Sequence, residues 1–264
     1  LIKTHVWLTF PTGDSPADYQ MTIPDRQFSE SGWVGGDFTR DGQFVAFGRW
    51  LNVWPSFPTS DAVAPSLIVK SFAFIAGEGN VAIAGNRAYV ANYNGNRVYG
   101  YRTIPTTNVD PDFVIGADDV CTNTFFTNFQ LMGAVPVSNG RSLMAFSPGD
   151  RRLELYRDMP DESNARPDAL LTVPPQLNAG DVWGDTWVLG GESTIYVWRS
   201  FPGNGELPAQ TFTTRIGSAS LVNVSGVALD DRYFYVADRQ LNKVYIWEGI
   251  PVSYTHLRAH ETRE

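Results

Sequence analysis

The sequence predicts an all-β protein, a β-propeller built from four-stranded antiparallel blades. Three observations support this prediction: the composition, one short motif that recurs six times, and four strand signals in each repeat. The chain has 264 residues, among them 24 glycines, 17 prolines and 13% aromatic residues. This composition suits short strands joined by tight turns. Long helices are not expected, because no segment carries a sustained apolar period of 3.6 residues.

The recurring motif is an aromatic residue, three further residues and a proline, with a large apolar residue directly before the proline. Its prolines are separated by 47, 47, 55, 42 and 49 residues, a mean of 48. Such even spacing over six copies indicates a structural repeat rather than chance. The six copies are Trp7–Pro11, Trp54–Pro58, Tyr101–Pro105, Tyr156–Pro160, Trp198–Pro202 and Trp247–Pro251.

Each repeat contains signals for four strands. A small-residue segment with glycine comes first, and a two-residue turn then leads to a β-rich run such as Tyr89–Ala91. The aromatic residue of the motif lies in the third strand, which the motif proline ends because proline cannot donate to a strand ladder. A second proline opens the outer strand. We expect the small-residue strand to be innermost, where blades converge, and the aromatic residues to fill the wider outer gaps.

The number of strand signals sets the expected ring size. The inner strands occur five times and the aromatic strand occurs six times, because residues 1–24 supply only the last two strands of a blade. Residues 253–264 break the repeat in place of a final strand, so we interpret them as a non-native tail and assign the propeller to residues 1–252. The simplest parent is six-bladed and incomplete at both ends, which makes the chain a fragment. Seven or eight blades remain open.

Charge and composition exclude some partners. The formal net charge of −8 disfavours nucleic acid, because an acidic surface repels phosphate backbones. The chain has no apolar run of about 18 residues that could cross a membrane. The single cysteine, Cys121, is expected to be a plain thiol in a loop.

Two segments share one pattern: Tyr89–Asn92 with Asn96–Val98, and Tyr235–Asp238 with Asn242–Val244. They resemble the NHL repeat family, whose pattern is Tyr-Val-Ala-Asp followed by Asn, a basic residue and an apolar residue. In the first segment, asparagine stands at the acidic position. The resemblance implies a six-bladed propeller of the kind found in secreted or cell-envelope bacterial proteins, but it implies no particular activity.

Related six-bladed propellers include enzymes, so catalysis needs separate consideration. His5 is the only histidine outside the tail, which argues against a histidine-based zinc site or acid–base pair. Calcium would need oxygen ligands from several blades, and the inner strands and their entry loops offer few carboxylates. No cofactor is therefore expected, although a calcium-dependent hydrolase or lyase remains the alternative. The oxygen-bearing candidates are Glu30, Asp37, Glu78, Asn80, Asn178, Asp181, Asn223 and Ser225.

We therefore predict a non-catalytic binding or scaffold domain that recognises a protein, a peptide or a carbohydrate. Trp33 and Trp183 lie on or beside inner strands where the fold favours small residues, so they either plug the channel or face a ligand. Trp50 lies in a loop between the second and third strands and is expected to be exposed. These tryptophans and Asp181 are the predicted ligand-binding residues.

Overall fold

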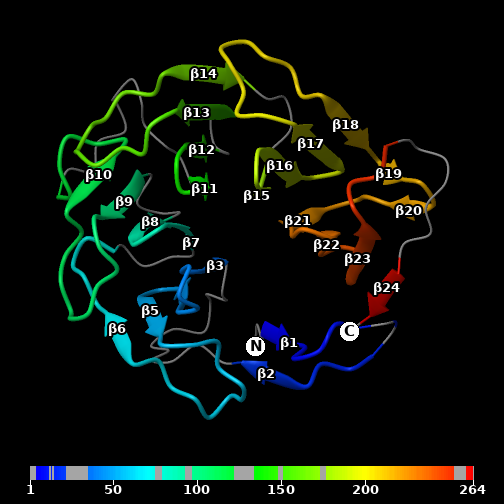
Figure 1. Cartoon of the computed structure of the whole chain (residues 1–264), viewed down its shortest axis with the longest axis horizontal. Helices are drawn as coiled ribbons and strands as arrows, with labels where there is room; N and C mark the ends of the chain where they lie inside the picture. Colours follow the sequence, from blue (N-terminus) through cyan, green and yellow to red (C-terminus); the bar gives the residue numbers. More distant parts are fainter. Residues whose placement is uncertain are drawn as a thin grey trace. The chain divides into compact units, whose positions relative to one another are not determined.

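The computed structural model describes residues 4–11, 13, 15–21, 35–74, 79–92, 97–121, 134–147, 151–172, 177–252 and 260–263. Every regular element among these residues is a β-strand, as predicted (Figure 1). A search of the described residues for a helix able to cross a membrane found none.

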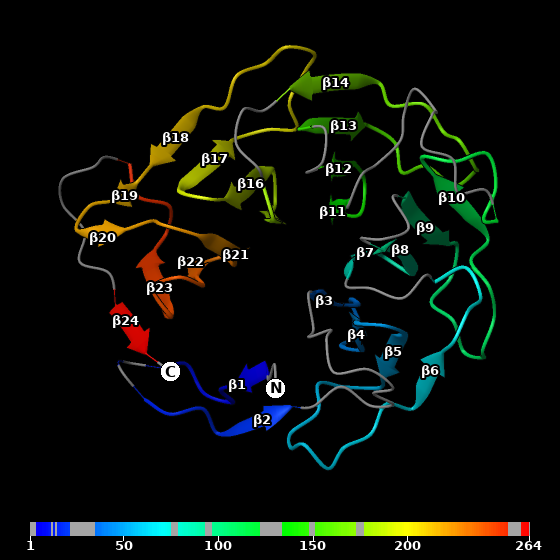
Figure 2. The same ribbon diagram turned by 180° about the vertical axis from the view of Figure 1, so that it is seen from behind.

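Five four-stranded antiparallel sheets form the blades, and each sheet keeps its strands in chain order (Figure 2). The first three blades are β3 (Gly35–Phe38), β4 (Phe44–Phe47), β5 (Leu51–Trp54) and β6 (Leu67–Val69); β7 (Gly79–Ala84), β8 (Arg87–Asn92), β9 (Arg97–Tyr101) and β10 (Phe113–Ile115); and β11 (Val135–Ser138), β12 (Leu143–Ser147), β13 (Arg152–Tyr156) and β14 (Ala169–Thr172). The last two are β15 (Ala179–Trp183), β16 (Thr186–Gly191), β17 (Thr194–Trp198) and β18 (Gln210–Thr213); and β21 (Val224–Leu229), β22 (Tyr233–Asp238), β23 (Lys243–Glu248) and β24 (His260–Arg263).

Two further sheets have only two strands each. One pairs β1 (Thr4–Val6) with β2 (Tyr19–Met21), and the other pairs β19 (Arg215–Ile216) with β20 (Ala219–Ser220). The described residues thus form five complete blades rather than the expected six, and the N-terminal segment supplies two strands, as the repeat predicts.

The last blade differs from the prediction. The sequence predicts three strands there, followed by a tail outside the fold. Residues His260–Arg263 instead form β24, which pairs antiparallel with β23 from Lys243↔Arg263 to Ile246↔His260. An exposed third strand offers unpaired backbone groups, and any nearby extended segment can pair with it whatever its side chains.

The chain divides into two compact units. The first unit contains Leu1–Leu8 and Asp18–Ala169, and the second contains Thr9–Ala17 and Leu170–Glu264. The first unit therefore holds β1, β2 and the first three blades up to the start of β14. The second unit holds the last two blades and the segment that connects β1 to β2.

Apolar layers between neighbouring blades form the core of the first unit. One cluster joins the first and second blades through side chains such as Val45, Phe47, Val90 and Tyr99, all fully buried. A second cluster joins the second and third blades. The small-residue strands lie where blades come closest: a Cβ on Gly35 would overlap the side chain of Asn80 in the next blade. Glycine is therefore required at this position by an inter-blade approach.

The structure explains why the motif uses tryptophan or tyrosine. Trp54, Tyr101, Tyr156, Trp198 and Trp247 are all buried. The polar tips of three of them donate to a carbonyl in the loop that leads to the outer strand: Trp54 Nε1 to Val63 O at 3.0 Å, Tyr101 Oη to Val109 O at 3.3 Å and Trp198 Nε1 to Glu206 O at 3.4 Å. One side chain thus fills the blade interface with its ring and holds the following loop with its polar atom.

The motif proline ties its own blade to the preceding sheet. The carbonyl of Pro160 accepts a hydrogen bond of 2.7 Å from the hydroxyl of Tyr89, which belongs to the second blade. The carbonyl of Pro58 accepts one from Tyr19 of β2. In the second unit, the carbonyl of Pro251 accepts one of 2.5 Å from Gln210 Nε2 of β18. Proline cannot donate from its nitrogen, but its carbonyl is a full acceptor.

Candidate functional site

The structure separates the four predicted ligand-binding residues. Trp33 lies outside the described residues. Trp50 lies between β4 and β5, where it is half-buried and packs against the core between the first and second blades, so the expectation of an exposed side chain is not met. The guanidinium carbon of Arg49 lies 5.0 Å from the centroid of the Trp50 ring. Trp50 directly precedes Leu51, the fully buried first residue of β5, so its place between the strands does not carry the side chain into solvent.

Asp181 and Trp183 lie two residues apart on β15, so they point to the same side of the strand. Asp181 Oδ1 accepts from the backbone of Val182 at 2.8 Å, and Oδ2 accepts from the backbone of Leu229 at 2.6 Å. Leu229 is on β21, so the carboxylate joins the first strands of two neighbouring blades. Trp183 is 53% exposed and is therefore not a buried plug. It remains a candidate binding residue in the second unit.

Asp37 repeats the role of Asp181 in the first unit. Each aspartate pairs with a valine of the second strand, Asp37 with Val45 and Asp181 with Val188. Asp37 Oδ1 accepts from Phe38 N and Oδ2 accepts from Ile83 N, each at 2.7 Å, and Ile83 is on β7 of the next blade. Burial raises the pKa of Asp37 to about 6, and the two amide hydrogen bonds oppose that rise.

Several of the oxygen-bearing calcium candidates already accept hydrogen bonds from backbone amides. Both oxygens of Asp37 and of Asp181 accept backbone amides, and Asn80 Oδ1 accepts from Val81 N. Glu30 and Glu78 lie outside the described residues. Within the described part of the chain, no group of three His, Cys, Asp or Glu side chains is placed to hold a metal ion. Asp37 and Asp181 therefore join the first strand of one blade to the first strand of the next by hydrogen bonds.

Asp238, the acidic residue of the sharper NHL-like segment, also has a structural role. Its Oδ2 accepts from Val222 N at 2.7 Å and Asn223 N at 3.0 Å, and its Oδ1 accepts from Gln240 N at 3.1 Å and Leu241 N at 3.0 Å. The side chain is buried. One carboxylate therefore fixes the segment that enters β21 and the turn that follows β22.

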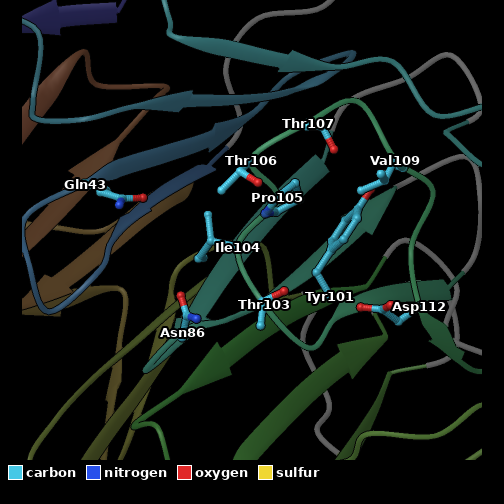
Figure 3. A pocket seen from close by; sticks show the side chains of 10 residues that line it. All are labelled: Gln43, Asn86, Tyr101, Thr103, Ile104, Pro105, Thr106, Thr107, Val109 and Asp112. Carbon is cyan, nitrogen blue, oxygen red and sulfur yellow. The ribbon is translucent and has the colours of Figure 1, made fainter.

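A pocket of about 390 Å³ lies in the first unit, at the end of the blades that carries the β3–β4 and β7–β8 turns. Figure 3 shows Thr103, Ile104, Pro105 and Thr106 on the loop between β9 and β10, with Gln43 and Asn86 contributed by the two turns. Tyr101, Thr107, Val109 and Asp112 complete the lining. The loop is held in place because Ile104 N donates to Asn86 O at 2.7 Å.

Neutral polar groups dominate the pocket. None of the ten lining residues carries a positive charge. Asp112 is the one carboxylate; its Oδ2 accepts from Arg102 N at 2.8 Å, and its Oδ1 lies 3.9 Å from Arg102 Nη1. Burial and the nearby charges of Asp110 and Asp112 raise the pKa of Tyr101 well above its usual range, so its hydroxyl stays protonated. The sequence did not predict this site, because its residues come from turns and loops of two blades.

Three phenylalanines of the first blade form the first-blade aromatic patch: Phe38, Phe44 and Phe57. Phe44 and Phe57 pack against the core cluster of Val6, Met21, Ala46 and Trp54, which joins this blade to β1 and β2. The ring centroids are 5.1 Å apart for Phe38–Phe44, 5.6 Å for Phe38–Phe57 and 5.0 Å for Phe44–Phe57. Phe38 is 50% exposed, and Gln43 of the pocket directly precedes Phe44. The first blade therefore presents an accessible aromatic surface close in sequence to a polar pocket.

Comparison with known proteins supports the fold. No protein-family model matches the chain, and no curated protein matches it. Among solved structures, the chain is similar to the WD40 β-propeller domain of Doa1, with a TM-score of 0.51 and 11% sequence identity over 84% of this chain and 67% of that chain. The chain therefore has an all-β propeller fold with four-stranded antiparallel blades.

Proposed function

We propose that this chain is a non-catalytic binding or scaffold domain that recognises a protein, a peptide or a carbohydrate through the pocket and the first-blade aromatic patch. The composition of the pocket carries the proposal. Its lining combines hydroxyl and amide groups with one carboxylate that is already bonded to Arg102. A concave site of this kind is typical of a recognition surface, and Phe38 adds an exposed aromatic ring in the same blade as Gln43.

The same composition disfavours acid–base catalysis at this pocket. A general acid or base needs a titratable group poised near the working pH and aimed at the substrate. Asp112 is held by Arg102, and the pKa of Tyr101 is raised far above neutral pH. The hydroxyl of Tyr101 therefore does not meet the requirement for proton transfer.

Selection from two libraries tests the proposal. A phage library of random peptides and an array of neutral glycans are screened against the purified chain, and each ligand obtained is measured by calorimetry. The Phe38→Ala/Phe57→Ala variant should weaken at least one ligand about tenfold, as expected when aromatic contacts are removed. Phe72→Ala is the control, because Phe72 is 67% exposed and lies outside the patch and the pocket. Ligands that bind parent and patch variant equally would refute the assigned surface.

A calcium-dependent hydrolase or lyase is the second candidate function. Carboxylates on inner strands favour it, and Asp37 and Asp181 occupy equivalent strand positions. Their bonds to backbone amides make it the weaker candidate.

Trp183 offers a second exposed aromatic surface, in the second unit.

We also propose that the chain derives from a six-bladed NHL-like propeller. The Tyr19–Pro58 and Tyr89–Pro160 bonds support this, because in each a tyrosine of one sheet donates to the carbonyl of the next blade's motif proline, from the outer strand β2 in the first case and from the second strand β8 in the other. β1 and β2 would then be the outer half of a sixth blade.

A further inference from the structure

We infer that the pocket beside the β9–β10 loop binds an uncharged carbohydrate. This inference rests on the proposed binding function and narrows it to one ligand class. It follows from the donors and acceptors that the pocket offers, from its charge, and from its apolar surface.

The polar groups of the pocket match those of a sugar. A sugar hydroxyl both donates and accepts, so it is best satisfied by groups that also do both. Threonine hydroxyls and side-chain amides have this property, whereas lysine and arginine only donate. Thr103, Thr106 and Thr107 are exposed, and their hydroxyls make no hydrogen bond within the described part of the chain.

Charge favours a neutral ligand over an ion. An anion would find no cation among the lining residues, and it would lie close to the carboxylate of Asp112. A cation would compete with Arg102, which donates its backbone amide to Asp112 and places its guanidinium 3.9 Å from it. The carboxylate nevertheless keeps acceptor capacity for a hydroxyl, because each of its oxygens has two lone pairs.

The pocket also offers apolar surface for the C–H groups of a sugar ring. Ile104, Pro105 and Val109 line it between the polar groups. Its volume of about 390 Å³ lies within the ~300–1,000 Å³ range of small-molecule sites. Two hydrogen bonds hold the loop that carries most of the lining, one from Tyr101 Oη to Val109 O and one from Ile104 N to Asn86 O. Little ordering of this loop is therefore needed on binding.

A glycan array provides the test. The purified chain is applied to neutral glycans that carry hexose, N-acetylhexosamine and deoxyhexose units, and to sulfated and sialylated glycans. We expect binding to at least one neutral glycan, with little change between 50 and 500 mM salt because no ion pair forms. The Thr103→Val/Thr106→Val variant should raise the Kd about tenfold, since two hydroxyl contacts are lost.

The first blade offers a matched control. Ser56 and Thr59 flank its motif proline as Thr103 and Thr106 flank Pro105, but they do not line this pocket. The Ser56→Ala/Thr59→Val variant should bind as the parent does. The inference is overturned by a blank array, by a preference for anionic glycans, or by equal loss in both variants. If peptides that depend on Phe38 and Phe57 bind while the array stays blank, this inference fails and the proposed function stands. If neither library yields a ligand, both fail.

Discussion

Replacing Asp238 with alanine should destabilise the last blade severely. Four backbone amides lose their acceptor, at the distances of 2.7 to 3.1 Å given above. Val222 and Gln240 are exposed, so water can replace the carboxylate at their amides. Asn223 and Leu241 are partly buried, and a hydrogen bond to a charged acceptor contributes roughly 1.5–3 kcal/mol. We therefore expect a loss of about 3–6 kcal/mol in the free energy of unfolding.

Urea denaturation followed by tryptophan fluorescence measures this loss. Asp238→Asn keeps one acceptor, the amide oxygen, so the free energy of unfolding should fall about half as much. Asparagine is the residue at the matching place, Asn92, in the second blade. Asp231→Ala, an exposed change in the same blade, is the control and should stay within ~0.5 kcal/mol of the parent. A loss below ~1 kcal/mol in Asp238→Ala would refute the assignment of a structural role to this carboxylate.

Three further outcomes are expected. The folded-state pKa of Asp37, about 6, exceeds the unfolded value of 3.8, so the folded state binds more protons. The free energy of unfolding should therefore fall as the pH rises from 4 to 6, by at most ~3 kcal/mol. The difference between the pH dependences of the parent and Asp37→Asn melting temperatures isolates this effect, and parallel curves would contradict it. Tyr89→Phe should cost about 1–2 kcal/mol in urea denaturation, because the buried hydroxyl bond to Pro160 is lost, whereas Tyr196→Phe should be neutral. Calcium and EDTA should both leave the melting temperature unchanged, because the inner-strand aspartate oxygens already accept amides; a rise with calcium would instead favour the enzyme alternative.

Periodicity predicted the parts of the fold that repeat. The motif located the third strand of every blade, because burial and a polar tip demand the same kind of residue at Trp54, Tyr101 and Trp198. β24 escaped prediction because strand pairing uses backbone groups, and residues 260–263 carry no repeat signal. The five complete blades likewise differ from the six that the motif count suggested, since the first copy is joined to only two strands.

Site residues were harder to predict, because contacts between blades depend on register. Asp181 was identified as a ligand candidate, but its partner Leu229 lies 48 residues away, and Asp37 shows the same relation to Ile83. Aligning the inner strands by their pairing with Val45 and Val188 would have revealed a repeated structural role. The pocket could not be found this way, because the loop of one blade and the turn of another meet only in three dimensions.

The segment Thr9–Ala17 has a consequence for how the chain comes apart. Phe10 stacks on Tyr233 at 4.5 Å, so this segment packs with the last blade, while β1 and β2 on either side of it belong to the first unit. The backbone therefore passes between the two units three times, near residues 8, 17 and 169. A protease that cuts only near residue 169 would leave Thr9–Ala17, which belongs to the N-terminal fragment, packed within the fold of the C-terminal fragment. Such a nicked chain should migrate as one species until it is denatured.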